Sequence, residues 1–151
     1  MGDLDLESEL PLGHWLKRAY LAMTSYVNDL LRPHDLTYSQ WQVLSLVGRR
    51  SPAPATQREV QGCMRVEAAT LTGVVDGLVR RGWLRRQENA ADRRVNELSL
   101  TETGSAIYAE LAPWVSAQVR ERLQHGLSPG QVALAREVLQ QMAQNLTGDP
   151  K

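Results

Sequence analysis

The stretch RRGWLRRQENAADRR occupies residues 80–94, and VNELSL follows it at residues 95–100. The first part holds six arginines and two acidic residues, in a chain whose formal net charge is zero. The second part alternates apolar and polar side chains, which is typical of a half-buried strand. With residues 83–86 as its partner strand, it predicts a hairpin whose polar tip spans residues 87–94. A hairpin rich in guanidinium groups suits a DNA-binding wing, because arginine pairs with phosphate and fits a narrow minor groove.

The residues before this hairpin predict two short helices with a tight turn between them. Thr56 and Glu59 have the spacing of a capping box, which starts a helix that runs to about Cys63. An amphipathic helix follows over residues 67–81. A helix-turn-helix followed by a hairpin makes a winged helix-turn-helix lobe, which we expect over residues 37–100.

Amphipathic helices are also predicted before this lobe and at its start. Apolar residues recur at helical spacing over residues 10–31, and Pro33 ends that pattern. A second capping box, formed by Thr37 and Gln40, starts the next helix. Two prolines in residues 48–55 forbid helix, so we expect a loop there.

Two further helices are predicted after the hairpin. The first begins after Thr101 and ends at Gly126, and Pro113 is expected to kink it because proline removes one backbone donor. Ser128 and Gln131 form a third capping box, which starts the last helix.

This order of elements predicts a mainly α fold with a small β hairpin (α+β), in which a winged helix-turn-helix core is flanked by N- and C-terminal helices. Residues 10–150 are expected to form a single domain. The helices of residues 10–35 and 102–147 carry more apolar surface than one small core can bury, so we expect them to form a homodimer. Residues 1–9 hold four acidic side chains and are expected to form a flexible arm. Without that arm the chain is net positive.

The composition excludes several classes of protein. With 151 residues, 42% apolar and 23% charged, the chain is typical of one soluble globular domain. No apolar run approaches the roughly 20 residues of a membrane span, and the amino terminus is acidic where a secretory signal is basic. We therefore expect a cytoplasmic protein that makes no membrane contact.

Catalytic and metal sites are not expected either. The single Cys63 excludes an intrachain disulfide and a zinc site built mainly on thiolates. Its simplest interpretation is a small buried residue at a helix end, and redox sensing is the alternative. The three histidines are scattered, and the chain has no glycine-rich phosphate loop. The sequence thus predicts no enzyme, no metal site and no cofactor.

Several segments resemble the MarR family of winged-helix transcriptional regulators, and its SlyA branch in particular. They read LTYSQWQVL, TQREV followed by LTGVVDGLVRRGWLRR, and ADRRVNELSLTETG. The resemblance extends from about Leu12 to Leu146. Its most specific part is the Asp92-Arg93-Arg94 tip, which is followed by Leu98, Leu100, Thr101 and Gly104. It implies a homodimer, most often a repressor, that binds a pseudo-palindromic operator in double-stranded DNA.

The resemblance also implies roles for the residues of the wing. Arg93 matches the arginine that enters the minor groove in this family, whereas Asp92 and Arg94 match the pair that braces the hairpin. Arg85 and Arg86 adjoin the wing, and because strand neighbours point to opposite faces, only one of them is expected to contact phosphate. The predicted DNA-binding residues are Arg65, Glu67, Ala69, Thr70, Thr72, Arg85, Arg86 and Arg93.

The recognition helix departs from the family pattern. Relatives usually have a serine and an arginine in this helix; here Thr70 replaces the serine, and Gly73 stands where the arginine is usual. One bidentate contact to guanine is therefore lost. Either Arg65 compensates, or the protein depends more on wing contacts and DNA shape. Glu67 either accepts a hydrogen bond from a cytosine amino group or caps the helix.

The resemblance implies a site for a small aromatic anion between the first helices and the DNA-binding lobe. Arg18 matches a position that contacts carboxylates in SlyA-like proteins, and helical spacing brings Trp15 and Met23 near it. The candidate residues are Trp15, Arg18, Met23, His34, Tyr38 and Trp41. Ordinary core and dimer packing is the alternative role for these residues. The alternative function for the whole chain is a winged-helix protein-interaction module that does not bind DNA specifically.

Overall fold

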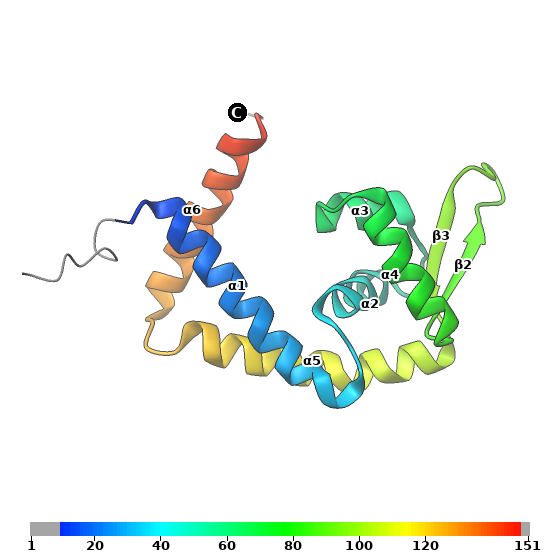
Figure 1. Cartoon of the computed structure of the whole chain (residues 1–151), viewed down its shortest axis with the longest axis horizontal. Helices are drawn as coiled ribbons and strands as arrows, with labels where there is room; N and C mark the ends of the chain where they lie inside the picture. The colour runs from blue at the N-terminus through cyan, green and yellow to red at the C-terminus, as the bar shows by residue number, and fades with distance from the viewer. Residues whose placement is uncertain (1–9, 149–151) are drawn as a thin grey trace, which may run out of the picture. The chain divides into compact units, whose positions relative to one another are not determined.

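The computed structural model describes residues 10–148, and the chain divides into two compact units between Ser116 and Ala117. The predicted flexible arm, residues 1–9, lies outside the described residues. The first unit contains α1 (Leu12–Leu31), the 3-10 helix η1 (Arg32–His34), α2 (Tyr38–Arg50), β1 (Ala55–Thr56), α3 (Gln57–Met64), α4 (Ala68–Arg80), β2 (Leu84–Glu88), β3 (Asn96–Leu100) and the start of α5 (Glu102–Gln124). The second contains the end of α5 and α6 (Pro129–Thr147) (Figure 1).

The three predicted capping boxes are all confirmed. In each, the side chain of the N-cap residue accepts a hydrogen bond from the third helical residue, whose own side chain accepts one from the N-cap backbone. The pairs are Thr37 with Gln40, Thr56 with Glu59, and Ser128 with Gln131. The hydrogen bonds from Thr56 hold the pKa of the Glu59 carboxyl below its usual value. Local sequence therefore sets where α2, α3 and α6 begin.

The predicted hairpin is confirmed as part of a larger sheet. Strands β2 and β3 pair antiparallel with Arg86 opposite Leu98, and the two-residue strand β1 pairs with the other edge of β3. The order of the antiparallel sheet is therefore β1-β3-β2. Strand β1 was not predicted, because two residues are too short to show an alternating pattern. Its pairing ties the start of the helix-turn-helix to the wing, which we define as residues 84–100.

Two predicted boundaries and one predicted burial are wrong. Helix α2 continues to Arg50, past the expected loop start at Gly48. The ring of Tyr108 packs where a Cβ of Gly48 would lie, so this glycine serves helix packing. Strand β2 extends to Glu88, two residues beyond the predicted end. Cys63 is exposed: it lies in the last turn of α3, a short helix in which Val60 is the buried residue.

The core of the first unit lies where α2, α4 and the sheet meet. Helix α2 packs against α1, α3, α4 and β3. The largest fully buried side chains are leucines and valines from these elements: Leu31, Leu44, Leu71, Leu78, Leu98, Val43, Val47, Val60 and Val75. This packing holds α4 beside the wing within one lobe (Figure 1).

Hydrogen bonds of Thr101 join the base of the wing to the start of α5. The backbone N–H of Thr101 donates to the Trp83 carbonyl at 3.1 Å, and its hydroxyl donates to the Gly82 carbonyl at 2.6 Å. The Gly104 N–H in turn donates to the Thr101 hydroxyl oxygen at 3.0 Å. Helix α5 continues through Pro113, and the kink expected there stays a prediction. Within residues 10–148, every helix is too short or too polar to cross a membrane.

Candidate nucleic-acid interface

The N-terminal turn of α4 presents small side chains to solvent. Ala68, Ala69 and Thr70 are all exposed. Glu67 is the N-cap residue of α4, as the capping alternative expected, although its side chain makes no capping hydrogen bond. Its exposed carboxylate therefore stands at the helix N-terminus, which favours negative charge.

The hydroxyl of Thr72 is engaged inside the helix-turn-helix. It donates to the Ala68 carbonyl at 2.9 Å and accepts from the Gln57 side-chain amide at 3.2 Å. The second contact joins α3 to α4. Thr72 thus positions α4, and its hydroxyl proton is not available to a partner outside the protein.

The turn between α3 and α4 depends on Arg65. This residue adopts a left-handed conformation with φ of 55°, and its N–H donates to the Gln61 carbonyl at 2.9 Å. Its side chain is exposed beside the start of α4. Gly73 has open space around the position of a Cβ, so packing does not demand glycine there.

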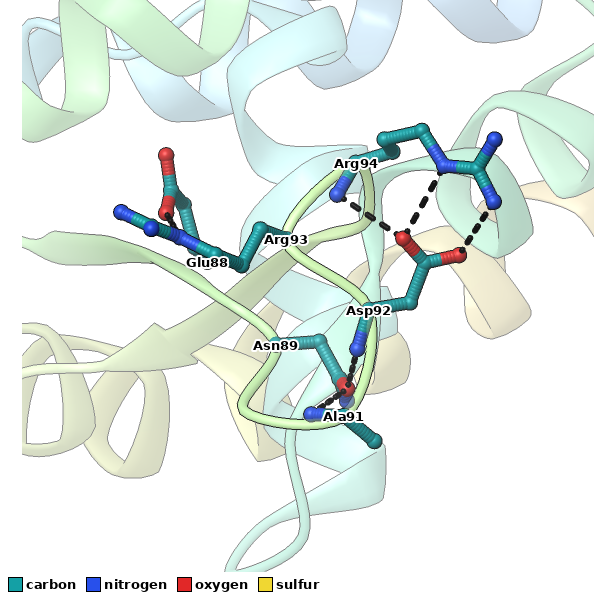
Figure 2. A network of polar contacts seen from close by, with 6 residues as sticks. All are labelled: Glu88, Asn89, Ala91, Asp92, Arg93 and Arg94. Atoms are coloured by element: carbon teal, nitrogen blue, oxygen red, sulfur yellow. Dashed lines mark hydrogen bonds and ion pairs between the residues drawn. The ribbon is translucent and has the colours of Figure 1, made fainter.

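Asn89 organises the wing tip, which we define as residues 89–95. Its side-chain oxygen accepts hydrogen bonds from the N–H groups of Ala91 and Asp92 at 2.8 and 3.0 Å (Figure 2). Its backbone N–H donates to the Val95 carbonyl at 2.8 Å, which closes the loop. Asn89 was not singled out from the sequence, although asparagine at the start of a polar loop favours this kind of turn.

Asp92 and Arg94 form the second contact of the wing tip. The Asp92 carboxylate accepts from the backbone N–H of Arg94 at 3.1 Å and from its guanidinium Nε at 3.2 Å (Figure 2). Hydrogen bonds from the Arg94 side chain, then from its backbone, hold the pKa of the Asp92 carboxyl below its usual value. The carboxyl therefore keeps its charge, and with it these contacts, until the pH falls below the usual aspartate range.

Arg93 lies on the opposite side of the loop from Arg94. Its Nε donates to the Glu88 carboxylate at 3.0 Å, and its side chain is 86% exposed (Figure 2). The ordered turn of Asn89 and Asp92 therefore fixes where the Arg93 backbone stands, while its guanidinium stays accessible. Glu88 was not considered from the sequence, because nothing in the pattern places it against Arg93.

The two arginines of β2 differ in their contacts. Arg86 reaches α4, where its Nη1 lies 2.8 Å from a carboxylate oxygen of Asp76. Arg85 is exposed and stands opposite Ser99 in the sheet. Arg86 therefore ties the wing to the recognition helix, and of the two Arg85 is the better candidate to contact phosphate.

Arg81 stabilises the fold through contacts within the protein. Its guanidinium lies 3.7 Å from the centre of the Trp83 ring and donates to the backbone carbonyls of His34 and Asp35. These contacts join the end of α4 to the turn before α2. The arginine-rich stretch thus combines structural arginines with exposed ones.

Of the six candidate residues for a ligand site, the structure brings only two to the same pocket. Tyr38 and Trp41 line a pocket of about 250 Å³ together with Gln42, Ser45, Leu46, Arg49, Cys63 and Met64. The other four candidates do not line it. Arg18 lies over the Trp15 ring at 5.3 Å, the His34 ring is 6.2 Å from Trp114, and Met23 is half-buried in α1.

The pocket contains groups that suit a polar aromatic ligand. The Ser45 hydroxyl is buried and has no hydrogen-bond partner among the described residues. Burial, with a smaller effect of Tyr20, raises the pKa of the Tyr38 hydroxyl, which therefore stays a hydrogen-bond donor at neutral pH. The Arg49 guanidinium supplies a positive charge at the pocket wall.

The chain is similar to known proteins over most of its length. A model of the MarR family matches residues 34–95, which include the helix-turn-helix and the wing tip. The multiple antibiotic resistance protein MarR of Escherichia coli K12 is 30% identical over 139 residues, which cover 91% of this chain and 95% of the relative.

Solved structures have the same fold. Mutant MarR from E. coli complexed with operator DNA has a TM-score of 0.80 and 29% identity, and covers 93% of this chain and 99% of its own. BpsR of Bordetella bronchiseptica, whose DNA binding is regulated by 6-hydroxynicotinic acid, has a TM-score of 0.78 and 27% identity over 94% of this chain and 98% of its own. The regulator SlyA, with a TM-score of 0.82, 20% identity and 93% and 96% coverage, shares the fold.

Proposed function

Given that this chain belongs to the MarR family of transcriptional regulators, we propose that it is a homodimeric repressor of a pseudo-palindromic DNA operator. Helix α4 of each protomer enters the major groove, and the wing tip enters the minor groove. A two-fold axis sets the two α4 helices about one helical turn of DNA apart, roughly 34 Å. The observation that carries this proposal is the pre-ordered wing tip, which presents an exposed Arg93 in the same lobe as the exposed start of α4.

The proposed contacts divide between base edges and the phosphate backbone. Ala69 and Thr70 face the bases, and Thr72 adds its methyl group because its hydroxyl proton is donated to the Ala68 carbonyl. Arg65 and Arg85 contact phosphates, which position the protein without reading the sequence. Glu67 accepts from a cytosine amino group, since no capping bond holds it. Arg86 acts indirectly, through its contact with α4.

Gly73 shifts the balance of recognition toward the wing. Without a long donor at this position, α4 reads fewer base edges. An arginine in a narrow minor groove responds to the shape and potential of the DNA instead. We therefore propose that Arg93, braced by the Asp92–Arg94 pair, supplies a large part of the discrimination.

The proposed dimer rests on exposed apolar side chains in each unit. In the first unit, α1 exposes Leu12, Trp15 and Leu21. In the second unit, no described residue of α6 is buried, and its exposed large apolar residues are Leu134, Val138, Leu139 and Leu146. Surfaces of this kind on a water-exposed helix mark an interface, and a second copy of the chain is the partner that closed symmetry supplies.

Selection of bound sequences from random duplex DNA tests this function most directly. We expect recovered sites to contain two inverted half-sites about one helical turn apart, because a two-fold dimer reads each half identically. Affinity for the best site should fall steeply as salt rises, since phosphate contacts release counterions. Light scattering of the free protein should give the mass of a dimer at micromolar concentration.

The same measurements separate the alternative, a protein-interaction module. If no sequence is enriched and weak binding shows little salt dependence, the DNA-binding proposal fails. A stable monomer together with single, unpaired half-sites would contradict the homodimer while leaving DNA binding intact.

We further propose that a small aromatic anion bound in the α2–α3 pocket releases the repressor. The pocket offers ring surfaces, the unpartnered Ser45 hydroxyl and the Arg49 cation. Its wall includes the end of α3, and α3 holds α4 through the Gln57–Thr72 hydrogen bond. A bound ligand lowers the affinity for DNA only to the extent that it binds the conformation that does not bind DNA more tightly than the one that does.

6-Hydroxynicotinic acid and salicylate are suitable probes for this site. We expect either probe to lower DNA affinity, and Arg49→Gln to remove that effect by removing the counter-charge. Basal DNA affinity of the variant is measured first, because Arg49 is exposed. Arg18→Gln is the matched comparison: loss of the probe effect in this variant alone would place the anion on α1 instead.

A further inference from the structure

We propose that the pocket at the corner between α5 and α6 binds the acidic arm, residues 1–9, of the second copy in the dimer. This inference rests on the homodimer of the proposed function, and it assigns a contact to a segment that lies outside the described residues. The sequence alone predicts only a flexible arm there. The pocket offers this arm a surface that suits both its charges and its leucines.

The pocket lies entirely within the second unit, where α5 passes into α6 (Figure 1). Its volume is about 450 Å³, which is in the size range of small-ligand sites. Its apolar lining comes from residues at or just after the turn: Leu127, Pro129, Val132 and Ala133. Leu127 is 47% exposed, so the described part of the chain leaves much of this apolar surface uncovered.

Two arginines also line the pocket, one from each helix. Arg120 belongs to α5 and Arg136 to α6, and both are exposed. Neither forms an ion pair with another residue in the part of the chain that the structure describes. Glu121 and Glu137, which follow these arginines in the sequence, do not line the pocket. The pocket therefore combines apolar surface with two positive charges that the described residues leave unneutralised.

The acidic arm has the complementary composition. Residues 1–10 read MGDLDLESEL, with an acidic residue at each of positions 3, 5, 7 and 9, and the first basic side chain of the chain is that of Lys17. Because acidic residues alternate with leucines over residues 3–7, any short piece of this stretch offers both kinds of side chain. A leucine can cover the apolar corner while a neighbouring carboxylate pairs with a guanidinium, which matches carboxylate geometry.

The arm is assigned to the second copy because the contact then continues the proposed dimer interface. The arm leads into α1, and the pocket includes α6. Exposed apolar residues on these two helices carry the proposed dimer. Two-fold symmetry makes the contact occur twice, since each copy supplies one arm and one pocket. Complementary charges of this kind favour the correct partner and speed its association.

Disulfide trapping in the full-length chain tests the contact. Cys63→Ser first removes the exposed native thiol. One chain then carries Ser8→Cys in the arm, and a second chain of different mass carries Ala133→Cys in the pocket. After subunit exchange and mild oxidation, we expect a disulfide between the two different chains, because such a bond requires Cα atoms within about 7 Å. Mass spectrometry separates this product from disulfides between identical chains.

Ala135→Cys is the matched control for position. Like Ala133 it is an exposed alanine of α6, but it does not line the pocket. Two residues of an α-helix are about 200° apart around the axis, so position 135 faces nearly the opposite way. We expect a thiol there to be trapped by the arm much more slowly than one at position 133.

A second control tests the charges. Arg120→Gln/Arg136→Gln should slow trapping at position 133 roughly fivefold, a middle value for two exposed ion pairs. Arg32→Gln/Arg50→Gln removes the same charge from exposed arginines outside the second unit and should leave the rate unchanged. Raising the salt concentration should slow trapping in the chain that keeps all four arginines, because salt screens exposed charges.

Each outcome decides the proposal. Equal trapping at positions 133 and 135, or an unchanged rate in Arg120→Gln/Arg136→Gln, overturns the binding site while the repressor proposal stands. If a chain that carries both Ser8→Cys and Ala133→Cys closes the disulfide within itself, the assignment to the second copy is wrong. A monomer in light scattering contradicts the proposed homodimer, and this contact fails with it.

Discussion

Replacing Arg93 by alanine is expected to weaken binding to the selected operator by about 1–3 kcal/mol, the usual size of a specific DNA contact. The side chain is exposed at the end of a loop that Asn89 and Asp92 keep ordered, so little backbone entropy is lost when it enters a groove. Fluorescence anisotropy at fixed salt measures the change in Kd.

Arg32→Ala is the matched control for Arg93→Ala. Arg32 is also an exposed arginine paired with a carboxylate, that of Asp29, but it lies at the end of α1. We expect its replacement to leave operator affinity nearly unchanged. The double variant Glu88→Gln/Arg93→Ala shows how much of the Arg93 effect comes from an unopposed Glu88. Unchanged affinity in both Arg93 variants would remove Arg93 from the interface.

Replacing Gly104 by alanine is expected to destabilise the first unit by about 3 kcal/mol, at the upper end for overpacking. A Cβ at this position would lie 1.9 Å from the Trp83 carbonyl oxygen and 2.8 Å from its carbon. That backbone cannot move away easily, because Thr101 holds both the Trp83 and Gly82 carbonyls. Denaturant unfolding followed by circular dichroism measures the loss.

The expected change in stability for Gly104→Ala has the opposite sign to the one that helix propensity predicts. Alanine is the better helix former by about 1 kcal/mol, so propensity alone predicts that Gly104→Ala stabilises α5. Gly73→Ala in α4 provides the comparison, since nothing lies within 4 Å of its Cβ position, and it should stabilise the protein by up to about 1 kcal/mol. If the two variants changed the free energy of unfolding by the same amount, the wing would be free to move relative to α5.

Short-range patterns were sufficient for most of the fold. The capping boxes, the prolines and the apolar periodicity predicted the order and type of the helices, because these signals act between residues a few positions apart. The hairpin followed from the alternation of residues 95–100. Strand β1 was missed because it exists only through its pairing with β3. The end of α2 was misplaced because Gly48 is accommodated by a ring from α5.

The candidate interface was predicted less completely. The resemblance singled out Arg93, Asp92 and Arg94, and Asp92 and Arg94 do contact each other in the wing tip. Asn89 and Glu88 were not identified, since their importance depends on where the loop returns. The contact of Arg86 with α4 depends on Asp76, which only the tertiary structure brings beside it.

Local sequence is thus enough to specify the helices, the arginine-rich hairpin and the family resemblance, because each depends on residues near one another in the chain. The partners of Arg81, Arg86 and Arg93, in contrast, are decided by the tertiary structure. Arg81 binds the turn before α2, Arg86 binds α4, and Arg93 binds Glu88 across the wing tip. Charge alone cannot distinguish these roles, because an arginine acts on whichever carboxylate, ring or carbonyl the fold brings within reach.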